Sequence, residues 1–207
     1  MENSTRKGTD YEEKVLGLVR ELVKDGHIPF EEDACVFHRR KKYFSSDRES
    51  EINLENVLEL FARGVNTSTG QPLLVTIFEC KSYSHLVDVS EVEEFDSKLG
   101  QLKGFRAKGF METTKGYKSG AISFAKSRGI GLIRFVPDNQ IEILLYHMTP
   151  LHLEEIKKGF AKRANRGLTD PHYVSRHETE FAYDNGYVFP SALAAVRQSL
   201  LEMAKKV

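Results

Sequence analysis

The 207 residues are enough for one compact domain with an appendage, and 40% hydrophobic with 29% charged residues is the composition of a globular protein with an apolar core. There is no run of about eighteen apolar residues and no apolar stretch near the N-terminus, so neither a membrane-spanning helix nor a signal peptide is expected. The formal net charge is zero, and net charge alone therefore indicates no partner.

The first predicted element is a helix over residues 9–24. Apolar residues recur at three- and four-residue spacing between Val15 and Val23. Thr9 and Glu12 have the spacing of a capping box. Glu12 also falls on the apolar face of the helical wheel, where a carboxylate needs a partner. Two interpretations stay open: Glu12 caps its own helix, or it is a third acid at a functional site.

Three strands are predicted next, over about residues 34–43, 52–61 and 73–81. The turn-forming residues 64–72 join the last two strands, and this spacing indicates a hairpin. A helix follows from about Ser90, which has a glutamate three residues on and an apolar stripe behind it. The order of elements up to this point is helix, three strands, helix.

The next residues predict a strand, a helix and a strand, over 109–113, 119–128 and 130–136. This βαβ pattern implies two parallel strands joined by a right-handed crossover. One more strand is predicted over residues 139–147. Residues 1–148 are predicted to form the main domain, and the weakest boundary along the chain lies near residues 166–171.

Residues 149–207 are predicted to form a small C-terminal α/β extension. A charged amphipathic helix is expected over residues 150–166, and the residues around Asn185 and Gly186 have the chemistry of a tight hairpin. A last helix follows, with Ser191 as its N-cap. The extension would therefore contain a helix, a hairpin and a helix, and its residues show no motif with recognisable chemistry.

Cys35 and Cys80 lie far apart and lack the spacing of a zinc or redox motif. Free thiols are favoured over a disulfide for such a pair. A reducing environment, and hence a cytoplasmic location, is therefore expected.

Basic residues gather in one part of the sequence. Residues 98–134 hold nine bases and a single acid, Glu112, and residues 39–42 form a second basic run. Because phosphates respond to the local field, a neutral protein with such a segment can still bind a polyanion. A solvated surface is the alternative interpretation. The residues expected to contact DNA are Lys41, Lys42, Arg48, Lys103, Arg106, Lys115, Tyr117 and Lys118.

The chemistry-bearing pattern lies at the end of the strand over residues 73–81. Glu79 and Lys81 follow residues 73–78, which are apolar except for Thr76, and residues two apart in a strand face the same side. Glu55 in the preceding strand can approach Glu79 if the two strands pair. Two close carboxylates repel, and a divalent cation such as Mg²⁺ relieves the repulsion and activates a water molecule. Lys81 would orient or deprotonate that water. The alternative to a metal site is a surface ion pair between Glu79 and Lys81. Glu59, in the preceding strand, is expected to be a solvent-facing acid.

Several segments resemble Mrr-like restriction endonuclease domains of the PD-(D/E)XK superfamily. Residues 8–12 match the family's G-x-x-[FY]-E opening, and residues 78–83 contain E-C-K-x-Y, the most specific part of the resemblance. The similarity covers about residues 8–136. It implies an α/β fold with an αβββαβ core, in which helices flank a mixed sheet. It also implies Mg²⁺-dependent hydrolysis of DNA, with Mn²⁺ as a substitute, in restriction, defence or DNA processing.

The resemblance also implies roles for individual residues. Glu12 would be the helix acid, Glu79 a metal ligand and Lys81 the catalytic lysine. Gln101 would supply the glutamine that such nucleases often carry near the site. Glu55 stands where the family has an aspartate, and its extra methylene moves the carboxylate by about one bond length.

This departure leaves more than one function open. The first hypothesis is an active Mg²⁺-dependent DNA endonuclease, for which a homodimer is one option because cutting both strands calls for two sites. The second is a catalytically weak or inactive DNA-binding or regulatory module that keeps the nuclease fold. The third is an interaction domain that binds no nucleic acid.

Overall fold

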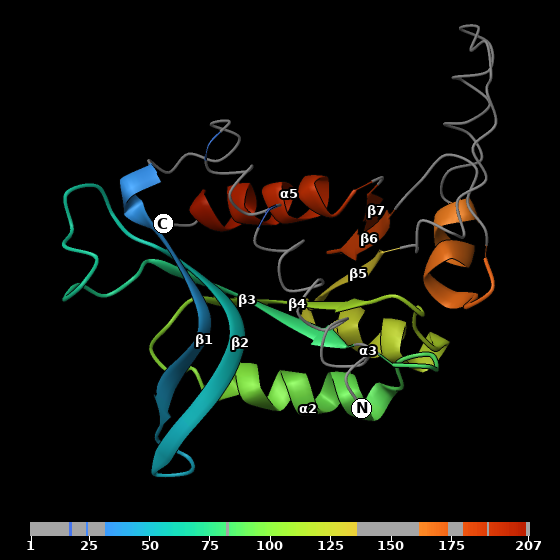
Figure 1. The fold of residues 1–207 in the computed structure, drawn as a ribbon, viewed down its shortest axis with the longest axis horizontal. Helices are drawn as coiled ribbons and strands as arrows, with labels where there is room; N and C mark the ends of the chain where they lie inside the picture. The colour runs from blue at the N-terminus through green and yellow to red at the C-terminus, as the bar shows by residue number, and fades with distance from the viewer. Residues whose placement is uncertain are drawn as a thin grey trace, which may run out of the picture.

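The computed structural model describes residues 32–81, 83–135, 162–173, 180–189 and 191–205, together with Gly17 and Lys24. Within these ranges the chain forms one seven-stranded mixed sheet with helices packed on its faces (Figure 1). Glu12 and the strand predicted over residues 139–147 lie outside the described residues. No described helix is both long and apolar enough to cross a membrane.

The strands stand in the sheet in the order in which they occur along the chain. Neighbouring strands are antiparallel, except that β3 with β4 and β4 with β5 are parallel pairs. The strands are β1 (Cys35–Ser45), β2 (Ser50–Leu60), β3 (Leu74–Lys81), β4 (Ala107–Thr113), β5 (Gly131–Phe135), β6 (Glu180–Asp184) and β7 (Tyr187–Phe189). The helices include the 3₁₀ turn η1 (Glu32–Ala34), α2 (Val89–Gly100), α3 (Ser119–Arg128) and α5 (Ala192–Ala204), and residues 162–169 are helical as well.

The predicted three strands, helix, strand, helix and strand are all present between residues 35 and 135. The parallel βαβ unit is confirmed by the pairing of β4 with β5. The start of α2 differs from the prediction, because the capping box is formed by Asp88 and Glu91 rather than by Ser90 and Glu93. The structure therefore shows a mixed α/β fold.

The sheet is covered on both faces. Helices α2 and α3 lie on one face and α5 lies on the other (Figure 1). Along β3, Val75 and Ile77 join the apolar cluster of α2 and α3, whereas Leu74 and Phe78 join the cluster of α5. Burial on both faces explains why the sequence of β3 is largely apolar throughout and does not alternate between apolar and polar residues.

The hairpin of β1 and β2 bends sharply near its middle. Leu54 and Val57 both join the cluster on the α2 side. They lie three positions apart in the sequence, and a regular strand would place them on opposite faces. Arg40 has a φ of 63°, in the left-handed region that non-glycine residues rarely adopt. In the ladder between β1 and β2, Arg39 pairs with Asn56 and Lys41 pairs with Leu54. The ladder skips the residues between them, Arg40 and Glu55. The outer half of the hairpin therefore curves past α2 (Figure 1).

The C-terminal extension continues the same sheet. Strand β6 pairs with β5, and Phe181 and Tyr183 of β6 belong to the α2-side cluster. Ala164 and Leu168, from the helical residues 162–169, join the same cluster. The domain boundary near residue 148 stays a prediction, and the described part of the extension shares its core with the main domain.

Candidate functional site

Glu55 lies at the point where β2 leaves β3. The antiparallel register pairs Asn56 with Phe78, so one further step brings Glu55 opposite Glu79. Beyond this pair, a side chain accepts the hydrogen bond of the β3 backbone: the backbone N–H of Cys80 donates to Glu55 Oε2 at 3.0 Å. Because Cys80 lies between Glu79 and Lys81, this hydrogen bond fixes the Glu55 carboxylate beside both residues.

Glu79 is a buried carboxylate held by two lysines. Its side chain is only 3% exposed, and Oε1 lies 3.0 Å from Lys81 Nζ and 2.9 Å from Lys98 Nζ. Lys98 comes from α2, and its ammonium also lies 3.2 Å from Glu94 Oε1, one helical turn earlier. The ion pair of Glu79 with Lys81 is therefore part of an internal cluster and is not a solvated surface pair.

The two lysines are charged in this arrangement. Burial by itself lowers the pKa of Lys81, but the attraction of Glu79 outweighs it, and the pKa lies above its ordinary value. The same balance of burial and Glu79 raises the pKa of Lys98. Lys81 therefore carries positive charge beside Glu79. Its two predicted roles, orienting or deprotonating a water molecule, both stay predictions.

Gln101 is the C-terminal cap of α2 and is buried. Its side-chain Nε2 donates to the backbone carbonyl of Ser97 at 3.1 Å. Its Oε1 has no hydrogen-bond partner within the described ranges. Gln101 is thus joined to its own helix, and its predicted place near the catalytic centre stays a prediction.

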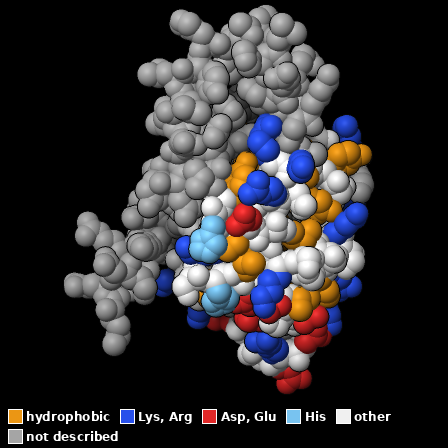
Figure 2. Space-filling model, turned by 90° about the vertical axis from the view of Figure 1, so that its right-hand side faces the viewer, with side chains coloured by type: hydrophobic (Ala, Val, Ile, Leu, Met, Phe, Trp, Pro, Cys, Tyr) orange, Lys and Arg blue, Asp and Glu red, His pale blue; other side chains and the backbone are white. Residues whose placement is uncertain are grey.

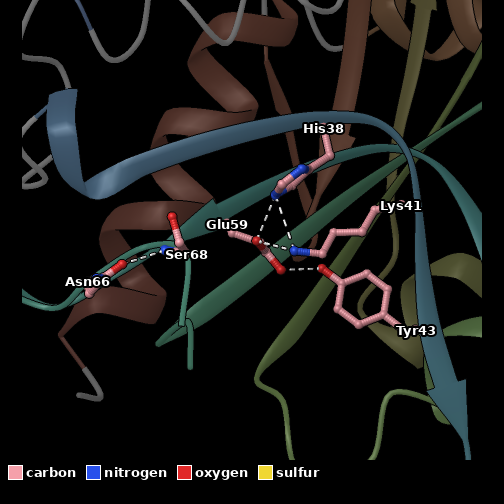
Figure 3. A network of polar contacts seen from close by, with 6 residues as sticks. All are labelled: His38, Lys41, Tyr43, Glu59, Asn66 and Ser68. Carbon is pink, nitrogen blue, oxygen red and sulfur yellow. Dashed lines mark hydrogen bonds and ion pairs between the residues drawn. The ribbon is translucent and has the colours of Figure 1, made fainter. Parts of the chain in front are cut away.

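Glu59 is buried, which corrects the prediction that it faces solvent. Its side chain is 3% exposed and lies inside the bend of the β1–β2 hairpin (Figure 3). Tyr43 donates to Oε1 at 2.6 Å, while Lys41 Nζ and His38 Nε2 lie 2.6 and 2.7 Å from Oε2. The bend brings these side chains of β1 around one carboxylate, and sequence spacing alone gave no signal of it.

The Glu59 cluster stabilises the bent hairpin. Burial tends to raise the pKa of Glu59, but hydrogen bonds from Lys41, Tyr43 and His38 hold it below the ordinary value. The Lys41 ammonium, which was predicted to contact DNA, is bound to this carboxylate and also lies 5.6 Å from the centre of the Tyr43 ring. We therefore assign Lys41 to the bend of the hairpin.

A change of Glu59 to glutamine should destabilise the protein in a pH-dependent way. Because its folded-state pKa is depressed, the ionised carboxylate contributes stability above its ordinary pKa of 4.5, and this contribution is lost as the pH falls below that value. We expect Glu59→Gln to lower the free energy of unfolding by roughly 2–3 kcal/mol at pH 7. Urea unfolding of both proteins from pH 7 to pH 3 measures the difference. A difference that stays constant over this range contradicts the assignment.

The predicted DNA-contact residues fall into two groups at opposite ends of β4. Arg106 precedes the strand, and Lys103 pairs with Asp47, in the turn at the tip of the hairpin that also contains Arg48. Lys42 lies on the hairpin itself, 3.0 Å from Glu51. Lys115 and Lys118 follow β4, and Lys118 pairs with Asp88. A strand of this length separates the two groups by about 20 Å.

Much of the predicted basic segment is neutralised or internal. Lys108 is buried, donates to the carbonyl of Gly129 at 2.7 Å and forms an ion pair with Asp184. Arg134 is fully buried and donates to the carbonyl of Asp170 at 2.6 Å. Viewed from the right of Figure 1, basic side chains are scattered among acidic and apolar ones (Figure 2). These two bases of the segment 98–134 are therefore internal and do not contribute to a surface that could contact a polyanion.

Tyr117 is a core residue, which corrects its assignment to the DNA interface. Its side chain is fully buried. The hydroxyl lies 2.7 Å from the carbonyl oxygen of Met111 and 2.8 Å from that of Ile133, and its single hydrogen can serve one of them at a time. The neighbouring lysines suggested a nucleic-acid contact, but this ring fills the space between β4, β5 and α3.

The residues that sequence reasoning missed are Lys98 and Glu94. Their four-residue spacing on a helix that follows the E-C-K strand was a usable signal, since such pairs face the same side. Nothing in the sequence indicated that this face of α2 lies over Glu79. That placement depends on packing between elements far apart in the sequence.

The carboxylates of Glu55 and Glu79 fit the ligand chemistry of Mg²⁺. This ion is commonly held by one or two carboxylates, while water and phosphate oxygens complete its coordination. The bonds described above involve Oε2 of Glu55 and Oε1 of Glu79. No group of three His, Cys, Asp or Glu side chains suited to a metal is found in the described part of the chain. A site completed by water or substrate agrees with both observations.

Comparisons of the chain with protein-family models, with curated proteins and with solved structures found no match. The likeness to Mrr-like nuclease domains therefore rests on the motifs of the sequence. What the structure adds is the mixed sheet and the side-chain arrangement around Glu79.

Proposed function

We propose that this protein is a Mg²⁺-dependent DNA endonuclease with a restriction-endonuclease-like core. Glu55 and Glu79 hold the cation, and Lys81 assists at the same place. The protein acts in restriction or DNA processing in the cytoplasm, and cutting both strands of a duplex calls for two such sites, as in a homodimer.

The observation that carries the proposal is the position of the Glu55 carboxylate. It accepts a hydrogen bond from Cys80 N at 3.0 Å, directly between Glu79 and Lys81. The buried Glu79 carboxylate with its lysine partner and the half-buried Glu55 carboxylate thus come from neighbouring strands and meet the same short stretch of β3. Charges in such a place are costly unless they are paired or hold an ion.

The side chains of this site would divide the work of phosphodiester hydrolysis. A bound Mg²⁺ supplies a water of lowered pKa and neutralises charge on the phosphate. Glu55, fixed by the Cys80 amide, and Glu79 orient the ion. Lys81 would orient the attacking water through its ammonium group and stabilise negative charge that develops on the phosphate oxygens.

Cleavage of plasmid DNA tests the proposal. The purified protein is incubated with supercoiled plasmid in Mg²⁺, in Mn²⁺ and in EDTA, and nicked and linear products are measured. We expect products with either metal and none in EDTA. Glu79→Gln should remove cleavage, and Lys126→Gln, on the exposed side of α3, should not. A wild-type protein that cuts no duplex, branched or modified DNA contradicts the proposal.

A second candidate function is a DNA-binding or regulatory module with weak or no cleavage. It is favoured by the binding of two lysines to one oxygen of Glu79 and by the glutamate at position 55. This candidate predicts DNA binding that weakens with salt and is not followed by cleavage.

The variant Glu55→Asp separates the two functions. If Glu55 is the working metal ligand, the shorter side chain moves away from the Cys80 amide, and we expect cleavage to fall about tenfold or more. If the site is degenerate, the same change restores or strongly increases cleavage. Plasmid cleavage rates in Mg²⁺ distinguish the two, and circular dichroism checks that both proteins are folded.

A further inference from the structure

We propose that Lys98 controls cation binding at the candidate site: its ammonium occupies Glu79 in the metal-free protein and moves to Glu94 when a divalent cation binds. This inference deepens the proposed function and rests on it for the identity of the ion. It makes Lys98 a positioning residue, because it acts through Glu79.

The first observation is that Lys98 has two acidic partners within reach. Its Nζ lies 2.9 Å from Glu79 Oε1 and 3.2 Å from Glu94 Oε1. Glu79 is buried on β3, whereas the Glu94 side chain is 63% exposed and lies one turn before Lys98 on α2. A small rotation of the Lys98 side chain can therefore exchange one carboxylate for the other, and α2 need not move.

The second observation is the competition at Glu79. Lys81 and Lys98 both lie within 3.0 Å of the same oxygen, so their ammonium groups repel each other across it. A divalent cation arriving at Glu79 adds two more positive charges at similar range. At a distance of a few ångströms this repulsion is larger than thermal energy even in a medium of high effective dielectric constant.

Lys98 is the lysine better placed to leave. Its side chain is 26% exposed against 15% for Lys81, and its second carboxylate is already in contact. Lys81 projects from the same strand as Glu79, two residues on, and so stays on the same face of the sheet.

Titration with Mn²⁺ tests the inference without reference to cleavage. Free Mn²⁺ is measured by electron paramagnetic resonance in the presence of wild-type protein, Lys98→Gln, Lys98→Arg and Lys126→Gln. We expect Lys98→Gln to lower the Mn²⁺ dissociation constant on the order of tenfold, since it removes the competing charge. Lys98→Arg keeps the charge and Lys126→Gln removes one elsewhere, so both should resemble the wild type.

A double-mutant cycle tests the transfer to Glu94. Glu94→Gln takes away the second partner of Lys98, so it should weaken Mn²⁺ binding several-fold in the wild-type background. In the Lys98→Gln background the same change should have a clearly smaller effect. Additive effects across the cycle contradict the transfer.

The outcomes separate this inference from the proposed function. Equal Mn²⁺ affinity in wild type and Lys98→Gln overturns the role of Lys98, whether or not the protein cuts DNA. Tighter binding in Lys98→Gln together with no cleavage by the wild type supports the role of Lys98 and overturns the endonuclease. No Mn²⁺ binding by any of the folded proteins overturns both.

Discussion

Replacement of Lys81 by alanine is expected to lower the rate of Mg²⁺-dependent plasmid cleavage by about 10²–10⁴-fold. The ammonium lies 3.0 Å from Glu79 Oε1 and is only 15% exposed, so it acts in a place with little water to screen it. Its loss removes a positive charge from the position where the phosphate gains negative charge. Cleavage rates of the wild type and the variant in Mg²⁺, at equal protein concentration, measure the effect.

Two controls show that such a loss is specific. Lys126→Ala removes a lysine from an exposed position on α3 and should cut at the wild-type rate. Thermal unfolding shows whether Lys81→Ala keeps its fold, since removal of Lys81 leaves Glu79 with Lys98 as its counter-ion. Cleavage at an unchanged rate in folded Lys81→Ala would falsify the assignment of Lys81.

Replacement of Asp184 by alanine is expected to lower the free energy of unfolding by about 3–5 kcal/mol. The Asp184 carboxylate is 2% exposed and forms an ion pair with Lys108, which is 9% exposed. The change leaves the Lys108 ammonium buried without a counter-ion from Asp184, beside the carbonyl of Gly129 and the ring of Phe110. Urea unfolding at pH 7 measures the loss.

A double variant tests whether the loss comes from an uncompensated charge. Lys108→Met combined with Asp184→Leu replaces the pair with apolar side chains and should recover most of the stability. Arg166→Ala breaks an exposed pair with Asp170 and should cost less than about 1 kcal/mol. If Asp184→Ala costs no more than Arg166→Ala, the C-terminal extension does not depend on this pair.

The regular part of the fold could be predicted because its signals are local. The apolar run before Glu79, the turn residues after Phe61 and the glycine at position 129 each act within a few residues of chain. The bend at Arg40 and Glu55 could not be predicted in this way. It depends on a left-handed residue within a strand and on the contacts that the bent hairpin makes with Glu59.

The site was predicted where strand periodicity was sufficient. Glu79 and Lys81 lie on one face, and β2 pairs with β3 up to Asn56 and Phe78, the residues next to Glu55 and Glu79, as spacing and hairpin pairing indicated. Lys98 was missed and Tyr117 was misassigned for the same reason. Whether a side chain on an amphipathic segment faces a buried carboxylate, the core or water depends on packing between elements far apart in sequence.

The most direct test of the metal site is a crystal structure of the protein grown with Mn²⁺. We expect an anomalous difference peak within about 2.5 Å of carboxylate oxygens from both Glu55 and Glu79, beside the Lys81 ammonium. Lys98 should then contact Glu94 and no longer contact Glu79. A folded protein that shows no peak between these two acids, or a peak only elsewhere on its surface, contradicts the account.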